Sequence, residues 1–494
     1  AAAWPQGSSS RCQPRWGLAA PKRVKMKTFA PHVVLCLLVG VVHGGEVDVS
    51  VDLSSNEGLF DAGNHTVGQG GLSPKLMWQG QVDAVTALRP GVMRLFVQTF
   101  YLFDDGTFDW QSLDASVDQI RATGATPLLN LCFKPQNMFP IINQSNCAPN
   151  DWDAWDQLIG VLGSRYNGSG FFYEVLNEPD NLLGGGTPYL CGVEEYTTMY
   201  EHTAKALLAA DSTARVGGPA VAFVDSDLLP ALLSFCATNN LRLDFVSWHF
   251  YTDCCPWEYG NQSRMVRELV DAAYTPPARQ PLLVVDEWGP GCGGAATLGF
   301  QPCFLLEGAF QLHSTGVAIS NFYQLRDFHV DPALFKRFLP TAFAIDTEIS
   351  WNYSPICYGL FDFQGHVRPT FFALKLLSRM SGTQHSVSVT PSRGESAEGG
   401  VHAMATTHAH LAMHSLLVWN FDAQPATVAV SLVSLAGRSL ARCVKLDSAP
   451  AGVLEENSFL VPQPAQDVSP PDATLRFALE AYGIVYCNVR PRTA

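Results

Sequence analysis

Two glutamates in this chain stand directly after apolar runs. Glu178 lies in FFYEVLNEPD (171–180), where strand-forming residues run into a turn that Pro179 enforces. Glu287 follows LLVVD (282–286). Strand propensity explains neither carboxylate. Two facing carboxyl groups can divide acid–base work: one, protonated, releases a leaving oxygen, and the other, ionised, stabilises or attacks a carbon centre. Glycoside hydrolysis requires this pairing.

Other polar residues near strand ends complete a candidate site. Asn177 is expected to hydrogen-bond a sugar hydroxyl, and Tyr251 is expected to donate to Glu287. Further residues predicted to contact a sugar are Arg94, Asn130, His249 and Trp288. Simpler interpretations stay open. The residues NEPD also favour a turn, which alone would explain Glu178. In the same way, Arg94 could form an ion pair below the rim of the barrel, and His249 could be a hydrogen-bonded rim residue without a role in binding.

Apolar runs alternating with helical patterns must position these residues. The predicted strands cover 47–52, 92–97, 126–131, 171–175, 214–218, 245–249, 282–286 and 317–322, and a last helix covers 370–381. Eight strand–helix units predict an α/β fold, a (β/α)8 TIM barrel whose site forms at the C-terminal strand ends. Glu178 and Glu287 then follow strands four and seven and face each other across the mouth.

The chain divides into three predicted segments. Residues 1–45 are an upstream segment and signal peptide, 46–382 the catalytic barrel, and 383–494 a β-sandwich with short alternating runs such as ATVAVSLV. Within 1–45, Met26-Lys27, the apolar run 33–42 and two small residues have the layout of a secretory signal, too short to span a bilayer. Residues 1–25 precede that methionine and are interpreted as untranslated or fused sequence.

Secretion is therefore expected, with no membrane partner after signal cleavage. Five N-x-S/T sequons agree with it, at Asn64, Asn143, Asn167, Asn261 and Asn352. Without residues 1–45, 25 basic side chains face 45 acidic ones, a net charge of −20. A surface this negative argues against nucleic acid and anionic membranes as partners.

Cysteine usage fits an oxidising compartment. Eleven cysteines follow residue 45, an odd number that predicts several bridges and at least one unpaired thiol. Bridges are expected among the cysteines of the loops after strands six and seven, which are Cys254, Cys255, Cys292 and Cys303.

No metal or cofactor is predicted. There is no CxxC pair with zinc spacing, no Gly-rich phosphate loop after a strand and no G-x-S-x-G elbow. Four histidines at even positions share one face of a possible strand, and we interpret them as surface or half-buried rather than metal-binding; they are His402, His408, His410 and His414.

Several motifs taken together resemble glycoside hydrolase family 39, which contains β-xylosidases and α-L-iduronidases. They are NEPD (177–180), GGPA (217–220), FVSWH (245–249), DEW (286–288) and YGLFDFQGHVRPTFFALKLLSRM (358–380). The resemblance covers roughly 47–494 and implies a retaining (β/α)8 enzyme in which Glu178 is the acid/base and Glu287 the nucleophile.

Two positions depart from the family pattern. Phe96 and Asn130 stand where family xylosidases carry a histidine and a glutamate that help to hold the sugar. Neutral amides at Gln98 or Asn130 suit a neutral sugar better than a uronic acid. We therefore predict a secreted retaining glycosidase, β-xylosidase-like on a neutral sugar. The alternatives are an α-L-iduronidase-like or other exo-glycosidase, and a carbohydrate-binding protein without turnover.

Overall fold

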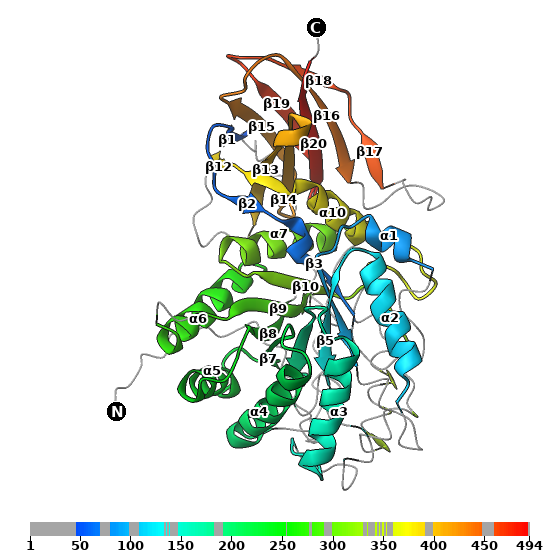
Figure 1. The fold of residues 1–494 in the computed structure, drawn as a ribbon. Coiled ribbons are helices and arrows are strands. Elements are labelled where there is room, and N and C mark those ends of the chain that lie inside the picture. The colour runs from blue at the N-terminus through cyan, green and yellow to red at the C-terminus, as the bar shows by residue number, and fades with distance from the viewer. Residues whose placement is uncertain are drawn as a thin grey trace, which may run out of the picture.

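The computed structural model describes residues 46–69, 80–97, 108–132, 147–181, 191–252, 254–275, 279–290, 299–329, 359–390, 399–446 and 459–492, with isolated positions at 135 and 138 and between 333 and 352. These residues form two stacked lobes, a barrel and a β-sandwich (Figure 1).

The barrel is a sheet of eight parallel strands. In chain order they are β3 (His65–Gly68), β4 (Val92–Phe96), β5 (Thr126–Leu131), β6 (Phe172–Val175), β7 (Arg215–Val221), β8 (Phe245–Tyr251), β9 (Leu282–Gly289) and β10 (Ile319–Tyr323). From β4 to β10 each strand pairs with its chain neighbour, and β3 pairs with β10. The sheet nearly closes where the Gln69 amide donates to the Arg94 carbonyl at 3.1 Å. The (β/α)8 prediction is confirmed.

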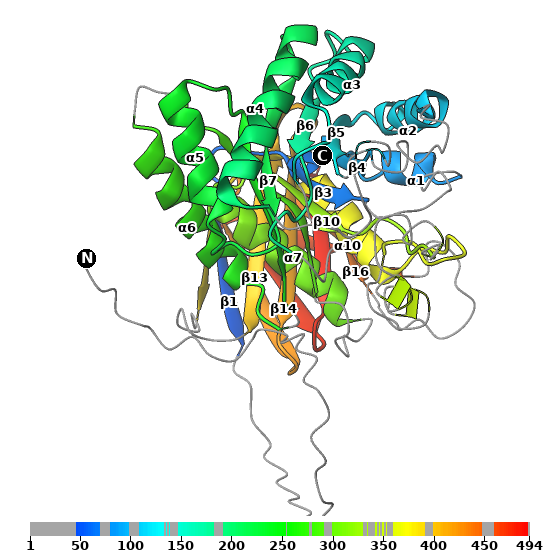
Figure 2. The same cartoon turned by 90° about the horizontal axis from the view of Figure 1, so that it is seen from below.

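Helices surround this sheet (Figures 1 and 2). They are α1 (Val82–Thr86), α2 (Trp110–Ala122), α3 (Trp152–Arg165), α4 (Val193–Ala210), α5 (Leu228–Asn239), α6 (Glu258–Ala273), α7 (Phe300–Ser314) and α10 (Pro369–Leu377). In α2, Leu113, Val117 and Ile120 form the buried face, and the Asp109 carboxylate caps the first turn by accepting from the Ser112 amide.

The sandwich has two sheets. The first has the order β12 (Ser386–Thr390), β1 (Val47–Asp52), β15 (Ala426–Val433) and β19 (Thr474–Leu479). The second has the order β17 (Leu460–Pro462), β16 (Ser439–Leu446), β20 (Ile484–Pro491), β14 (Met413–Phe421), β13 (Gly400–His408), β11 (Gly382–Gln384) and β2 (Leu59–Phe60), with β18 (Gln466–Val468) paired to β16.

The first predicted barrel strand is wrong. Residues 47–52 form β1, which lies in the sandwich between β12 and β15, in blue among the orange and red strands of Figure 1. The cause is visible in VDVSVD, because Val49 and Val51 are buried while the polar residues between them are not, as a one-sided sandwich strand requires. The fully buried β3 takes the first barrel place. Glu178 and Glu287 therefore still belong to strands four and seven, β6 and β9.

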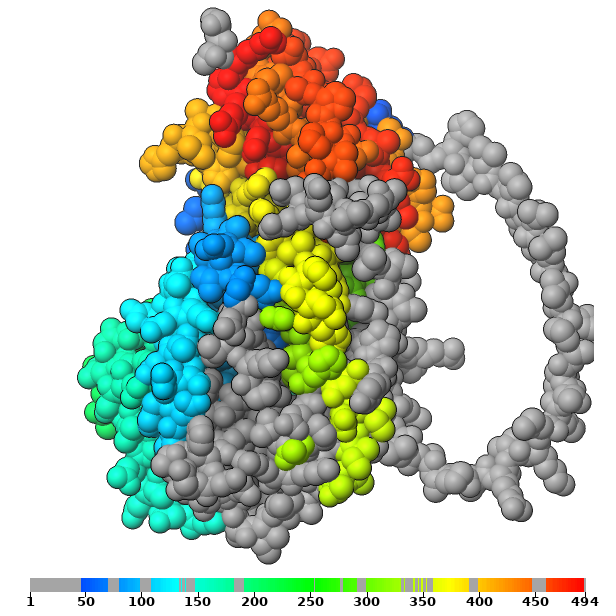
Figure 3. All heavy atoms as spheres, turned by 90° about the vertical axis from the view of Figure 1, so that its right-hand side faces the viewer, coloured from blue at the N-terminus to red at the C-terminus, as the bar shows by residue number. Residues whose placement is uncertain are grey.

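The second sandwich sheet packs on the barrel through α7. Trp419 of β14 is fully buried and donates its indole N–H to Glu307 of α7 at 2.8 Å. In Figure 3 the orange and red sandwich strands form a lobe directly above the barrel. Because β14 packs against α7 as well as against the sandwich core, its residues MHSLLVWNF are almost all buried.

Three disulfides join described cysteines: Cys147–Cys191, Cys254–Cys255 and Cys443–Cys487. The expected bridge within the loop after β8 is thus present, and Cys292 lies outside the described residues. Cys303 is a correction. It lies on α7 rather than in a loop, is buried without a disulfide, and its thiol donates to the Asn420 carbonyl of the sandwich. Like Cys236, it is an unpaired thiol, as the odd cysteine count predicted.

Surface features bear on the expected secretion. Of the sequons, Asn167 and Asn261 are exposed, Asn64 and Asn352 are half-buried, and Asn143 lies outside the described residues. Within the described part of the chain, no helix has both the length and the apolar character needed to cross a membrane.

Candidate active site

The turn after β6 holds Glu178 in a costly backbone conformation. Leu176, Glu178 and Ala220 have φ values of 65°, 44° and 51°, in the left-handed region that costs side-chain-bearing residues about 1–2 kcal/mol each. The Glu178 amide donates to the Ala220 carbonyl of β7 at 2.9 Å. This hydrogen bond between the turn after β6 and the end of β7 holds the turn in place. Strain maintained in this way is typical of functional turns.

Glu287 projects from β9 beside residues of β8. The register between β8 and β9 shifts after Trp248, and this bulge pairs His249 with Glu287. The Tyr251 hydroxyl donates to Glu287 Oε2 at 2.9 Å, the contact predicted from sequence. Arg94 Nη1 donates to Glu287 Oε1 at 2.5 Å. Both oxygens of this carboxylate are therefore oriented by donors.

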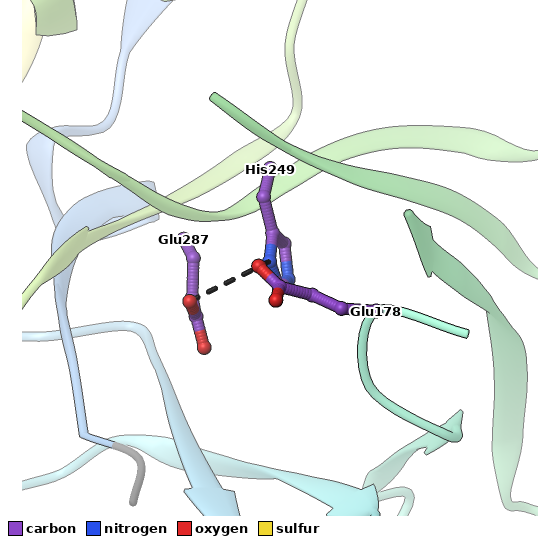
Figure 4. A group of neighbouring side chains, drawn as sticks. All are labelled: Glu178, His249 and Glu287. Carbon is purple, nitrogen blue, oxygen red and sulfur yellow. Dashed lines mark hydrogen bonds and ion pairs between the residues drawn. The ribbon is translucent and has the colours of Figure 1, made fainter. Parts of the chain in front are cut away.

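Glu178 and Glu287 face each other across the barrel mouth with His249 between them (Figure 4). One carboxylate oxygen of each glutamate and a ring nitrogen of His249 all lie within 4.8 Å of one another. This upper bound on the distance between two carboxylate oxygens is shorter than the roughly 6.5–9.5 Å of a carboxyl pair that activates a water, and it is compatible with a pair that acts without one.

His249 is held by carboxylates on several sides. Its Nδ1 lies 2.9 Å from Glu178 Oε1 and 3.5 Å from Glu287 Oε2, and its Nε2 lies 3.5 Å from Asp286 Oδ2. Burial alone would lower the pKa of His249, but the carboxylates of Glu287 and Asp286 raise that pKa well above its ordinary value. These carboxylates therefore favour the protonated form of the imidazole.

Arg94 forms the floor of the site. Its guanidinium is buried and contacts three carboxylates, Glu174, Asp286 and Glu287, at 2.5–2.7 Å. Its Nη2 also donates to Asn177 Oδ1 at 2.8 Å. Burial disfavours the charged guanidinium, but these acids outweigh it and raise the pKa of Arg94. The ion-pair interpretation of Arg94 thus describes its contacts better than direct sugar binding.

Glu174 and Asp286 are members of the site that sequence reasoning missed. Glu174 accepts from Ser247 Oγ at 2.6 Å and from Asn130 Nδ2 at 2.8 Å. Burial raises the pKa of Glu174 against the opposing effect of Arg94, whereas Arg94 and His249 overcome burial and hold the pKa of Asp286 below its usual range. The sequence did contain a signal for Glu174, because a charged residue inside the apolar run FFYEV needs a buried partner.

The remaining predicted residues divide into two groups. Asn130 lies at the site, where its Nδ2 is used by Glu174 and the Leu176 carbonyl while its buried Oδ1 has no hydrogen-bond partner. Trp288 does not lie at the mouth. Its ring packs edge-on against Tyr259 and Phe322, and a Cβ on Gly308 of α7 would lie 2.5 Å from it. This packing role replaces the sugar-binding role predicted for Trp288. Gln98 lies outside the described residues.

One group of described side chains has the spacing of metal ligands. It is Glu178, His249 and Glu287 itself, and the Arg94 guanidinium, which contacts Glu287 at 2.5 Å, opposes a metal ion there. The strand histidines have separate partners: His402 lies 3.5 Å from Glu307, His408 contacts the Arg379 carbonyl, and His414 contacts Thr407. They do not converge on a common site.

Comparison with known proteins gives this geometry a context. Residues 98–273 match the family described as glycosyl hydrolases family 39. A β-xylosidase of Caldicellulosiruptor saccharolyticus is 33% identical over 165 residues, which are 30% of this chain and 32% of the relative. Over this part of the chain the protein is similar to glycoside hydrolase family 39.

The family 39 match in sequence spans about a third of that relative's length, whereas the structural likeness is longer. The crystal structure of a monomeric β-xylosidase from Caulobacter crescentus superposes with a TM-score of 0.69 at 18% identity, covering 90% of this chain and all of that one. A bacterial orthologue of human α-L-iduronidase superposes with a TM-score of 0.62 at 16% identity, covering 91% of this chain and 84% of that one. Both structures share the fold of this chain.

Proposed function

We propose that this protein is a retaining glycosidase that cleaves O-glycosidic bonds by double displacement, with Glu178 as the acid/base and Glu287 as the nucleophile. One observation carries the proposal. Carboxylate oxygens of the two glutamates lie within 4.8 Å of each other, at the ends of strands four and seven of one barrel. A binding protein needs neither this separation nor a proton-transfer pair.

In the proposed mechanism each residue has a separate task. Glu178 gives its proton to the glycosidic oxygen as the bond to the anomeric carbon breaks, while Glu287 Oε attacks that carbon and forms a glycosyl ester. Water then attacks the ester, Glu178 takes the water proton, and the sugar leaves with its original configuration. Arg94 and Tyr251 orient the Glu287 carboxylate, and Asn181 Nδ2 donates to Glu178 Oε2 at 3.0 Å.

The charge of the site supports a neutral sugar. Arg94 and His249 are the cations of the described site, and both already contact carboxylates at 3.5 Å or less. A uronate would bring another negative charge beside Glu178, Glu287 and Asp286 without a free cation among the described site residues. The β-xylosidase relative, although it matches only part of this chain, agrees with a neutral pentose such as xylose.

We also propose that the protein is secreted. The described disulfides suit an oxidising compartment, and two exposed sequons are available for glycans. The segment with the signal-peptide pattern lies outside the described residues.

A substrate panel tests the proposed activity. The purified protein is assayed with aryl β-D-xyloside, β-D-glucoside, β-D-galactoside, α-L-arabinoside and α-L-iduronide, and a Glu178→Gln/Glu287→Gln double variant controls for contaminating enzymes. We expect hydrolysis of a neutral glycoside, most rapidly the xyloside, and much slower turnover of the iduronide. Turnover of the iduronide alone would overturn the sugar assignment. Sugar binding with no hydrolysis of any substrate would support a carbohydrate-binding protein instead.

A further inference from the structure

Phe223 is an exposed aromatic residue beside the candidate acid/base. Its side chain is 52% exposed, and it is the aromatic residue among the large hydrophobic side chains that are exposed in the described part of the chain. Other aromatic rings near the site, such as Trp248 and Trp288, are buried. An exposed phenyl ring keeps its apolar face available to a partner that covers it.

The backbone of Phe223 is tied to the turn that carries Glu178. Phe223 lies two residues after β7, and its amide donates to Asp180 Oδ2 at 3.1 Å, while the Ala222 amide donates to Asp180 Oδ1 at 2.8 Å. Asp180 follows Glu178 by two residues, and the Glu178 amide donates to Ala220. These hydrogen bonds fix Phe223 at the rim on the Glu178 side, away from Glu287 on β9.

The Glu178 side of the mouth is where a leaving group must lie. An acid that protonates the glycosidic oxygen contacts that oxygen directly, so the group attached beyond the oxygen extends over the rim next to Glu178. The ring faces of sugars carry C–H groups that pack against aromatic faces, and the remaining hydroxyls stay in water. A half-exposed phenyl ring fits this kind of partner.

We propose that Phe223 is the stacking residue for the leaving-group part of the substrate, a sugar or aryl ring, and that Asp180 positions it. The inference rests on the proposed glycosidase function and adds a binding position outside the catalytic pair. In this proposal the loop after β7 binds the leaving group. The sugar whose anomeric carbon is attacked by Glu287 binds in the barrel mouth.

The test compares leaving groups of different size on one sugar. Phe223→Ala and Phe223→Trp are assayed with xylobiose, whose leaving group is a sugar ring, and with β-D-xylosyl fluoride, whose leaving group is a single atom. Leu411→Ala is the control, because Leu411 is 60% exposed and lies in the sandwich. If the panel selects another neutral sugar, the same pair is made from that sugar.

We expect the ratio of kcat/KM for xylobiose to kcat/KM for the fluoride to fall roughly 3- to 10-fold in Phe223→Ala and to be preserved in Phe223→Trp. The control should keep the wild-type ratio. An unchanged ratio in Phe223→Ala, whether both rates fall together or neither falls, would reject the stacking role. Failure of the wild-type protein to hydrolyse either substrate would instead reject the proposed glycosidase function.

Discussion

Replacing Glu287 by Ala is expected to abolish hydrolysis of activated and natural glycosides alike, with a loss on the order of 10⁴-fold or more in kcat. Without the nucleophile no glycosyl ester forms, whatever the leaving group. The measurement is the kcat of Glu287→Ala on an aryl glycoside and on the matching disaccharide. Azide supplied in solution should restore turnover only with the opposite anomeric configuration in the product, because it would attack in place of the missing carboxylate.

Replacing Glu178 by Ala is expected to give a different phenotype. The first step needs an acid only when the leaving group is poor, so Glu178→Ala should retain much of its first-step rate on an activated aryl glycoside and lose it on the disaccharide. The glycosyl-enzyme should then accumulate, and azide should accelerate its breakdown with retained configuration. If azide gave the inverted product with Glu178→Ala, the two roles would be exchanged. Wild-type rates in both variants would remove the catalytic interpretation of the pair.

Replacing Arg94 by Met should cause the largest loss of stability. It would leave Glu174, Asp286 and Glu287 buried without their shared cation, and breaking a buried ion pair costs roughly 3–5 kcal/mol. The measurement is the urea midpoint of unfolding, with Arg165→Met as the control. Arg165 pairs with Asp114 at a partly exposed site, where such a pair is worth about 0–1 kcal/mol. Equal midpoints for Arg94→Met and wild type would contradict the account of the floor.

The stability deficit of Arg94→Met should also depend on pH. In the wild type, the lowered pKa of Asp286 contributes stability that is present above the unfolded pKa of an aspartate and is lost as pH falls through the folded value. Without Arg94 the pKa of Asp286 rises, because only His249 then opposes the effect of burial, and the stability that its ionised form contributes is lost at a higher pH. The stability difference between variant and wild type should therefore be smaller at pH 3 than at pH 8. A stability difference that did not change with pH would mean that Arg94→Met destabilises the protein through lost packing alone.

The barrel could be predicted because its strands are apolar runs of regular spacing, and one error shows the limit. VDVSVD was assigned to the barrel although its alternation buries one face only. The true first strand, His65–Gly68, has four residues and begins with a histidine, which gives little strand signal. The order of the later strands was unaffected, so the positions of Glu178 and Glu287 followed.

The sequence predicted those site residues whose positions follow from the ends of the barrel strands. It did not predict the contacts that depend on how side chains pack. Tyr251 and Glu287 lie on adjacent strands, and their contact follows from that adjacency. The prediction for Trp288 was wrong because its ring points away from the mouth and packs against Tyr259 of α6, a direction that the sequence motif DEW does not reveal. The contacts among Arg94, Glu174 and Asp286 depend on side-chain geometry across three strands, which spacing along the chain does not encode.

Trapping the covalent intermediate tests the central claim most directly. The protein is incubated with a 2-deoxy-2-fluoro glycosyl fluoride of the sugar selected by the panel, which forms the glycosyl-enzyme quickly and releases it slowly. Peptide mass analysis of the inactivated protein should find one fluoroglycosyl group on the peptide that contains Glu287 and locate it on that carboxylate. A fluoroglycosyl group on Glu178, or turnover of this substrate with no adduct on any residue, would contradict the account.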